Sequence, residues 1–399
     1  MTTDDTTPVL LGGARTPFVK FNGVFAGLRS HELGAHAVRA ALERTGVPAE
    51  AVDHVILGQV VQAGAGQGPA RQASIEAGIG WNVPAVTINK LCLSGLTAII
   101  DAARLIRTGE ASVVVAGGQE SMTNAPHLLL DSRKPYSLGE RTFEDSLNYD
   151  GLRDPFDGKL MGKATDDGNL MRAIARNRQD GFAALSHQRA AAAREHGGFD
   201  DEIVPVSVPQ RKGEPVVVSA DDGIRPTTTA EGLAALKPVF NRDSGTITAG
   251  NASQLTDGAA AVVVASKAYA LAHNLEWLAE IGSPGQVAGP DGSLHSQPSA
   301  AIVHAIGRHG ITVADLDVIE INEAFASVVL QSADDLGIDP SAVNAQGGAI
   351  ALGHPVGASG ARLALHVALE LKKRGGGTGI ASLCGGGGQG EALILTRSA

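Results

Sequence analysis

Apolar residues follow two alternating patterns along this chain. Short runs rich in Val, Ile and Leu, typical of buried strands, lie at residues 9–12, 53–60, 84–89 and 112–116. Between these runs, apolar residues recur every three or four positions, which is typical of helices that cover a sheet. Strands that alternate with helices predict a mostly parallel sheet covered on both faces.

Glycines mark the ends of two of these predicted helices. Ser30 is expected to cap a helix over 31–45 that stops at Gly46, and a second helix over 94–108 stops at Gly109. Glycine is favoured directly after a helix because it adopts the left-handed backbone conformation without a steric penalty.

The same order of elements returns near the C-terminus. Strands are predicted at 277–282, 316–322 and 378–384, a long helix at 358–374 and a final strand at 389–395. An order of elements that occurs twice predicts two similar halves packed against each other.

The comparison of the two halves also locates an insertion. In the second half, two neighbouring strands are joined by a few glycines, whereas in the first half the strand at 112–116 and its partner at 256–264 lie more than a hundred residues apart. An insertion of this size, with a long Ala-rich helix at 178–196, is typical of a lid or ligand-binding domain. The predicted division is 1–120 completed by 249–272 for the first half, 121–248 for the insertion and 273–399 for the second half.

Composition narrows the choice of function. The 399 residues include 42 acidic and 32 basic side chains, and the net charge of -10 argues against a general nucleic-acid or anionic-membrane surface. The 51 glycines predict many tight turns and close backbone approaches. Two cysteines are too few for a disulfide framework. No run of 18 apolar residues occurs, which argues against a membrane-spanning helix, and the first residues lack the features of a signal peptide. We expect a cytoplasmic enzyme with both thiols reduced.

Cys92 is the first candidate for chemistry. It lies between the predicted buried strand at 84–89 and the helix at 94–108. The N–H groups and the dipole at a helix N-terminus favour a thiolate over a thiol, and the thiolate is the nucleophilic form. The alternative is that Cys92 is a small core hydrophobe, which is the commoner role of a single cysteine.

Three further polar side chains follow or precede predicted strands of the second half. Asn322 and Cys384 stand at strand ends, and His354 lies in the glycine-rich stretch 347–360. Each alone has a common structural interpretation. The repeat, however, places the Cys92 turn opposite the His354 turn, as a nucleophile and its base, with Cys384 as a second thiol nearby. Two thiols and an imidazole without metal-ligand spacing favour acyl transfer.

Two apparent cofactor motifs do not hold. Residues 385–390 fit the pattern G-x-G-x-x-G but precede a strand, whereas a dinucleotide site needs a helix after the glycines. His31 and His36 are five residues apart and do not share a helix face as two zinc ligands four apart would. We therefore expect no metal and no bound cofactor.

Six segments resemble the signature segments of the thiolase family, and they occur in the family's order. The resemblance extends from Ala14 nearly to the end of the chain, and its segments are 89–96, 116–126, 248–258, 322–326, 347–360 and 384–390. It implies an α/β fold of five layers, αβαβα, built from two similar halves with an inserted loop domain that binds coenzyme A.

The resemblance also implies catalytic roles. Cys92 corresponds to the nucleophile that becomes acylated, and His354 to the base that activates it. Cys384 corresponds to the acid/base that acts on the α-carbon of the second acyl-CoA or on the leaving coenzyme A thiol. Asn322 matches the residue that holds a water in one oxyanion hole together with His354, and the N–H groups of Cys92 and Gly386 would form the other.

For coenzyme A and the acyl group the resemblance implies six contacts. Ser253 and Ala249 lie near the pantetheine, Phe325 lines the channel, Arg225 and Phe240 lie near the adenine, and Met161 belongs to the acyl pocket. Leu160 stands where acetoacetyl-specific members often carry His, which argues against a strict preference for acetoacetyl-CoA.

The function expected from this resemblance is that of an acetyl-CoA C-acyltransferase, as in fatty acid metabolism and β-oxidation. Acyl-CoA and acetyl-CoA would be the substrates, an acyl-thioester the intermediate, and a homodimer or homotetramer the assembly. Two alternatives stay open. One is a ketoacyl synthase-like condensing enzyme, a family that usually lacks the second cysteine, and the other is a thiolase-like acyl-CoA or lipid-binding protein with little turnover.

Overall fold

The strands of the protein form one main mixed sheet, as seen in a computed structural model that describes residues 5–398. The strand order is β12-β13-β14-β11-β1-β10-β5-β3-β4, and β2 pairs with β10 outside this path. The strands are β1 Pro8–Arg15, β2 Val19–Lys20, β3 His54–Gly58, β4 Ala85–Ile88, β5 Val113–Glu120, β6 His127–Leu128, β7 Glu144–Asp145, β8 Val206–Val208, β9 Val216–Val218, β10 Thr256–Ser266, β11 Ala279–Ala288, β12 Val318–Ile321, β13 Gly377–Gly385 and β14 Gln389–Arg397.

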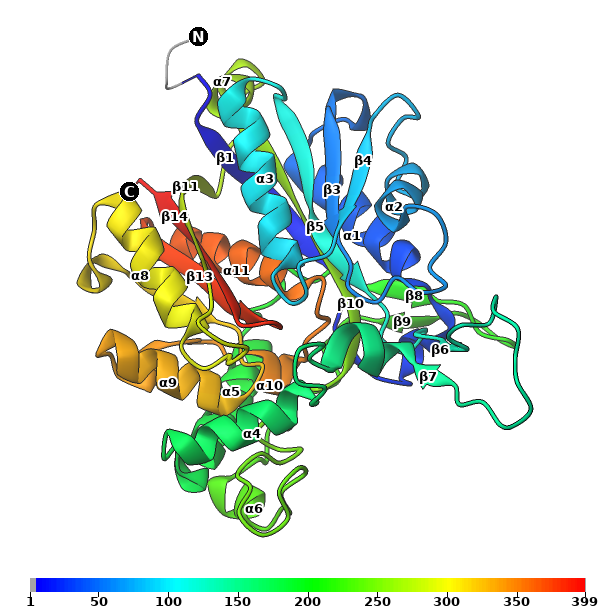
Figure 1. Cartoon of the computed structure of the whole chain (residues 1–399). Coiled ribbons are helices and arrows are strands. Elements are labelled where there is room, and N and C mark those ends of the chain that lie inside the picture. The colour runs from blue at the N-terminus through cyan, green and yellow to red at the C-terminus, as the bar shows by residue number, and fades with distance from the viewer. Residues whose placement is uncertain (1–4, 399) are drawn as a thin grey trace.

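The helices cover this sheet and build most of the insertion (Figure 1). They are α1 Ser30–Thr45, α2 Pro69–Glu76, α3 Ser94–Thr108, α4 Met161–Met171, α5 Arg176–Glu195, α6 Ala230–Ala234, α7 Lys267–Ala272, α8 Gln297–His309, α9 Ala326–Leu336, α10 Ala349–Leu352 and α11 Ser359–Arg374. Within the described residues no helix is both long and apolar enough to cross a membrane. The first four residues, for which the sequence predicts no signal peptide, lie outside the described part of the chain.

Helices α1 and α3 end where the sequence predicts. Gly46 and Gly109 follow them with φ values of 67° and 74°, the left-handed conformation that favours glycine. The predicted cap of α1 is wrong by one residue. Arg29 precedes the helix, its backbone N–H donates to the Glu32 carboxylate, and Ser30 is the first helical residue.

The sheet is not mostly parallel, contrary to the sequence-based prediction. Only β3–β4, β3–β5 and β12–β13 are parallel, and the other neighbouring pairs are antiparallel. The short glycine turn after β13 reverses the chain directly into β14, and β10 returns from the insertion antiparallel to β5. The alternation of strands and helices predicts parallel neighbours, and it contains no signal for these two reversals of chain direction.

Strand β4 also differs from its prediction as a buried strand. It lies at the edge of the sheet and pairs only with β3. Val86 in its centre is exposed accordingly. A short apolar run predicts the strand but not which of its faces is covered.

Alternation of side chains along the strands produces five layers. On β5, Val113 and Val115 pack with α1 and α2, whereas Val114 faces the opposite side, where α3 and α11 lie. On β14, Leu393 faces this same central layer and Ile394 faces α8 and α9. Figure 1 shows α3 and α11 between the two halves of the sheet. The predicted αβαβα architecture is therefore confirmed.

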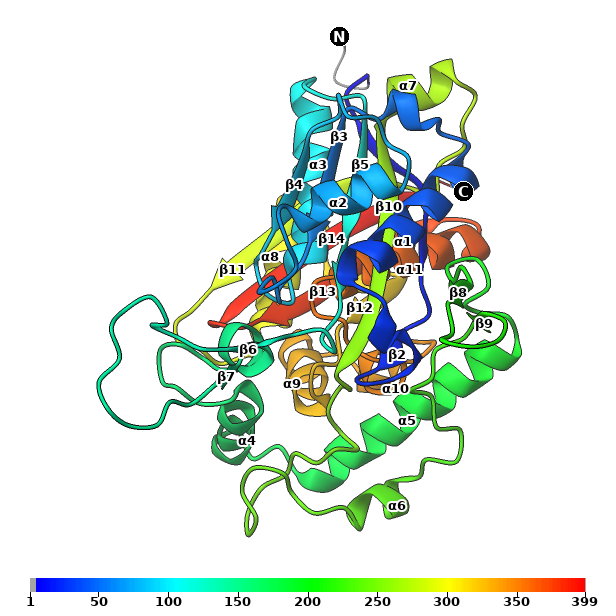
Figure 2. The same ribbon diagram turned by 90° about the vertical axis from the view of Figure 1, so that its right-hand side faces the viewer.

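The insertion leaves and re-enters the sheet at one place. β5 ends at Glu120, which pairs with Gly258 of β10, and the intervening chain carries α4, α5, α6 and two small hairpins. Residues 129–143 extend away from the body as an arm in both views (Figures 1 and 2). The boundaries 121 and 248 chosen from sequence stay predictions.

Buried ion pairs hold the insertion to both halves. The guanidinium of Arg15 on β1 donates to Glu202 at 2.8 Å and to both oxygens of Asp221 at 2.6 and 2.9 Å. His366 on α11 lies 3.0 Å from the other oxygen of Glu202. Burial raises the pKa of Glu202, but Arg15 and His366 outweigh it and hold that pKa below its ordinary value.

Glycines allow the two halves to meet backbone to backbone. A Cβ added at Gly58 or Gly95 would lie 2.7 or 2.9 Å from the carbonyl oxygen of Gly357, just before α11. A Cβ at Gly360 of α11 would overlap the backbone nitrogen of Leu96 on α3. Because backbone atoms move only with the whole element, these positions exclude any side chain.

We predict that Gly360→Ala destabilises the protein by about 2 kcal/mol or more, because the methyl group forces α3 and α11 apart. Gly307→Ala is the matched control, since Gly307 is also helical and a Cβ there meets nothing within 4 Å. Its helix gains up to about 1 kcal/mol from the better propensity of Ala. Chemical denaturation of both variants measures the difference. Equal stabilities would contradict the close backbone approach.

Candidate active site

Cys92 lies on a tight turn between β4 and α3. The residue before it, Leu91, has a φ of 53°, which is uncommon for a residue other than glycine. Local hydrogen bonds hold this conformation. The Leu91 N–H donates to the Asn89 side chain at 3.1 Å, and the Ser94 hydroxyl accepts from the Lys90 N–H at 2.8 Å and donates to the Leu91 carbonyl at 2.6 Å. The turn therefore presents Cys92 in a fixed position.

Burial favours the neutral thiol form of the Cys92 sulfur. Burial raises the pKa of Cys92 to about 12, against hydrogen bonding from the backbone N–H groups of Cys92 and Gly386, which lowers it. The carboxylate of Glu120 raises this pKa further. The Cys92 N–H at the start of α3 lowers this pKa, in the direction expected from the sequence, but burial outweighs it.

His354 is held in one tautomer by its neighbours. Its Nδ1 lies 2.6 Å from the Ser359 hydroxyl, and that hydroxyl donates its only proton to the Pro355 carbonyl at 3.1 Å. The hydroxyl therefore accepts from Nδ1–H. On the other side, the Asn322 amide nitrogen lies 3.3 Å from Nε2 and donates to it. This network assigns an unprotonated Nε2, the nitrogen that a general base needs.

Burial also keeps His354 uncharged. It lowers the pKa of His354 to about 4, and no other group contributes to the shift. At neutral pH the site therefore holds a neutral imidazole beside a neutral thiol.

The second thiol, Cys384, lies at the end of β13 and is 1% exposed. Burial and the neighbouring charge of Cys92 both raise the pKa of Cys384 above its ordinary value. Just beyond it, a Cβ on Gly386 would lie 2.7 Å from the Leu91 side chain and 3.4 Å from the Met161 sulfur. A side chain at this position would therefore displace the end of the Leu91 side chain beside Cys92.

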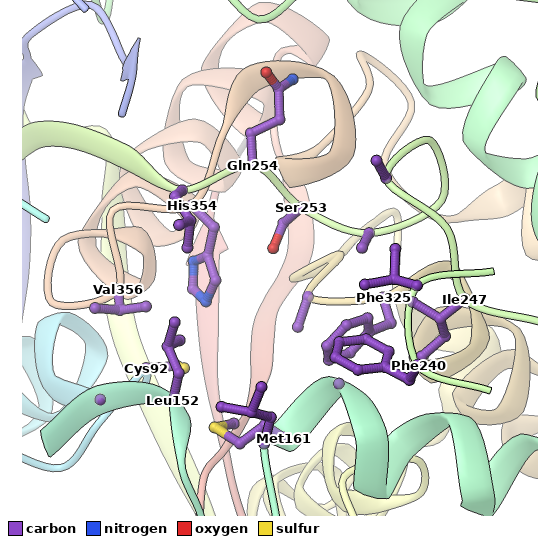
Figure 3. Close-up of a pocket in the computed structure, with 18 of the residues that line it drawn as sticks. Cys92, Leu152, Met161, Phe240, Ile247, Ser253, Gln254, Phe325, His354 and Val356 are labelled. Atoms are coloured by element: carbon purple, nitrogen blue, oxygen red, sulfur yellow. The ribbon is translucent and has the colours of Figure 1, made fainter. Parts of the chain in front are cut away.

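A mostly apolar cavity of about 240 Å³ opens onto Cys92 and His354. Figure 3 shows the His354 ring directed toward Cys92, with Met161, Ser253, Phe240 and Phe325 around the same space. The predicted ligand-contact residues that line it are Met161, Phe240, Ala249, Ser253 and Phe325, and Leu160 lines it as well.

Other predicted residues lie outside the lining of this cavity. Asn322 and Cys384 are buried beside it. Gly386 lines a second cavity of about 580 Å³, which shares Met161 with the first. Arg225 is exposed on the surface, and its backbone N–H donates to His187 at 3.2 Å.

Buried carboxylates that the sequence reasoning did not single out support the site. Glu323 accepts from the Ser186 hydroxyl at 2.7 Å, the Asn344 amide at 2.9 Å and the Ile350 N–H at 3.0 Å, which ties the Asn322 strand end to the segment before His354. The sequence did contain a signal for Glu323, because this residue belongs to the thiolase-like segment 322–326.

Glu120 has the same role on the other half. Its carboxylate accepts from the N–H groups of Val60, Val61 and Gly357 at 2.9, 3.1 and 2.9 Å. Burial raises the pKa of Glu120 to about 8, although these N–H groups lower it. The carboxylate joins the end of β3 to the turn that carries His354.

Comparisons with known proteins agree with this arrangement. The profile of the thiolase N-terminal domain matches residues 9–268, and that of the thiolase C-terminal domain matches residues 275–397. A probable acetyl-CoA acetyltransferase of Mycolicibacterium smegmatis is 59% identical over 98% of this chain and 100% of its own length. The acetyl-CoA acetyltransferase of Cupriavidus necator is 47% identical over 98% of this chain and 100% of its own, and a probable acetyl-CoA acetyltransferase of Escherichia coli is 48% identical over 98% of both chains.

The expected acyltransferase class is confirmed by these relatives. Both family domains occur in order, and the matches cover nearly all of the chain. The protein belongs to the thiolase family.

Proposed function

We propose that the protein is an acetyl-CoA C-acyltransferase that interconverts acyl-CoA plus acetyl-CoA and 3-ketoacyl-CoA plus coenzyme A by a ping-pong mechanism. The observation that carries this proposal is the neutral pair in one cavity, the Cys92 thiol and the unprotonated Nε2 of His354. The names of the relatives support acetyl-CoA as a substrate.

In the first half-reaction Cys92 exchanges one thioester for another. The Cys92 sulfur attacks the carbonyl carbon of an acyl-CoA while its proton passes to His354. The N–H groups of Cys92 and Gly386, which point at the sulfur, would stabilise the oxyanion. Coenzyme A then leaves as a thiol with the proton held by His354, so the acyl-thioester accumulates at little cost in free energy.

The second half-reaction forms a carbon–carbon bond. Cys384 would first pass its own proton to the neutral His354, and the thiolate so formed removes a proton from the α-carbon of acetyl-CoA. The resulting enolate attacks the acyl carbonyl on Cys92, and the bond to the Cys92 sulfur breaks. The proton held by His354 then passes to the released sulfur, so that all three side chains return to their neutral forms. A buried thiol with a raised pKa is suited to this step because its thiolate is a strong base, matched to a weak carbon acid. The Asn322 amide and His354 would hold the water that stabilises the enolate oxygen.

The presence of Cys384 beside Cys92 favours this reaction over the two alternatives. A ketoacyl synthase-like enzyme does not need a second thiol, and a binding protein with little turnover needs neither thiol nor base. A homodimer or homotetramer, a cytoplasmic location and a place in β-oxidation remain predictions of the family resemblance.

The catalytic proposal predicts a division of labour between the cysteines. Wild-type protein incubated with acetyl-CoA is expected to gain an acetyl group on the Cys92 peptide, detectable by mass spectrometry. Cys384→Ala should still gain it but lose condensation and thiolysis, because only α-proton transfer is removed. Cys92→Ser should lose all three. Unacetylated wild-type Cys92, or normal turnover by Cys92→Ser, would refute the covalent step.

Acetylation of Cys92 should depend little on pH between about 5.5 and 8.5. His354 with a pKa of about 4 is neutral above this value, and the Cys92 thiol with a pKa of about 12 is neutral below its own. The reacting forms therefore stay constant across the range. Rapid-quench measurement of acetylation tests this. A steep fall in the rate below pH 7 would instead indicate that His354 is protonated near its ordinary pKa of about 6.5, contrary to the lowered pKa in this site.

The apolar lining beside Leu160 predicts that the acyl group is not restricted to acetoacetyl. We expect thiolysis of a medium-chain 3-ketoacyl-CoA with a kcat/KM within about a hundredfold of that for acetoacetyl-CoA, since a methylene group in an apolar pocket is worth about 10- to 200-fold. Activity confined to acetoacetyl-CoA would contradict this. Activity only with acyl-carrier-protein substrates would favour the ketoacyl synthase alternative.

A further inference from the structure

One buried carboxylate joins the two cysteine segments. Glu391 on β14 is fully buried, and its oxygens accept from the Lys90 ammonium at 2.9 Å, from the Thr97 hydroxyl at 2.7 Å and from the Gln286 side-chain amide. Lys90 and Thr97 belong to the first half of the protein, whereas Glu391 and Gln286 belong to the second. The carboxylate therefore bridges the interface between the halves.

The partners of Glu391 flank Cys92 on both sides. Lys90 precedes Cys92 by two residues on the strained turn, and Thr97 lies in the first part of α3. On the other strand, Glu391 stands opposite Leu383, the neighbour of Cys384, in the antiparallel ladder of β13 and β14. A single side chain thus connects the turn that carries one thiol to the strand pair that carries the other.

The Lys90–Glu391 ion pair is largely shielded from water and therefore holds the Cys92 turn against β14. The carboxyl side chain is 0% exposed and the lysine side chain is 26% exposed, so water screens the pair less than it would on the surface. Removing one member of such a pair leaves a buried charge without its partner. Leu91, between Lys90 and Cys92, is held in a left-handed conformation that a freed turn would relax.

We infer that Glu391, acting through Lys90 and Thr97, is a positioning residue that sets the separation of Cys92 and Cys384. The inference rests on the proposed function. Acylation requires only Cys92 and His354, but carbon–carbon bond formation and cleavage require a substrate carbon held between both sulfurs. A displacement of about 1 Å between reacting groups lowers a rate by about a hundredfold. Loosening this bridge should therefore affect the second half-reaction more than the first.

The test compares the two half-reactions in Glu391→Gln and Lys90→Met. Both variants preserve the approximate size of the side chain, and the first also retains hydrogen-bonding capacity. Exchange of labelled coenzyme A into acetyl-CoA reports acylation of Cys92 alone, and thiolysis of acetoacetyl-CoA reports the complete reaction. We expect exchange within about threefold of wild type and thiolysis reduced by about 10- to 100-fold.

The matched control is Lys267→Met. Lys267 also pairs with a glutamate, Glu280, at 3.1 Å, and its side chain is 23% exposed, but the pair joins α7 to β11 away from both cysteines. Both activities of this variant should stay close to wild type. Equal losses of exchange and thiolysis in Glu391→Gln, or no loss of either, would overturn the positioning role. Failure of the proposed function would be seen separately, as wild-type protein that neither exchanges nor thiolyses.

Discussion

The whole arrangement depends on a contact between the two halves from which side chains are absent. The carbonyl of Gly357 lies against Gly58, Gly95 and Gly118, and Gly360 lies against the backbone of α3. Because their backbones are in contact, the N-terminal ends of α3 and α11 are held in a fixed position relative to each other. Cys92 precedes one of these helices and His354 precedes the other, so their proximity follows from the backbone packing. Several of the glycines of this glycine-rich chain are therefore required at the contact between the two halves.

Such close packing also excludes water, and exclusion of water decides the protonation states. Both thiols have raised pKa values and His354 has a lowered one, in each case with burial as the main cause. The site therefore begins neutral. Charge develops only when a thioester is present, against N–H groups and an amide that are already oriented.

The sequence was sufficient for the parts of the structure that depend on local patterns. Apolar periodicity and terminal glycines located α1 and α3, and the repeat indicated that Cys92 and His354 would face each other. Prediction from sequence failed where strand direction and burial depend on residues that are distant in the chain but close in space. The antiparallel pairing of β14 depends on a short turn, and the exposure of β4 depends on its place at the sheet edge.

The site shows the same division. Of the residues expected to contact the ligand, Met161 and Phe240 line the cavity although they lie outside the signature segments, whereas Arg225 lies on the surface. Ser359 fixes the His354 tautomer, yet a serine near a helix start has many ordinary roles. Glu391 lies in a mostly apolar strand. Its role in joining the two halves becomes apparent only from its contact with Lys90, about three hundred positions earlier in the chain.

The neutral state of the Cys92 sulfur has a consequence for its exposure to damage. Peroxides and simple alkylating agents react with thiolates, and the oxidation of cysteine to sulfenic acid begins from that form. Burial of the Cys92 sulfur, which favours the neutral thiol, also leaves the apolar cavity as its route of access. Compounds that imitate a thioester and fit this lining would therefore label Cys92 more selectively than general thiol reagents.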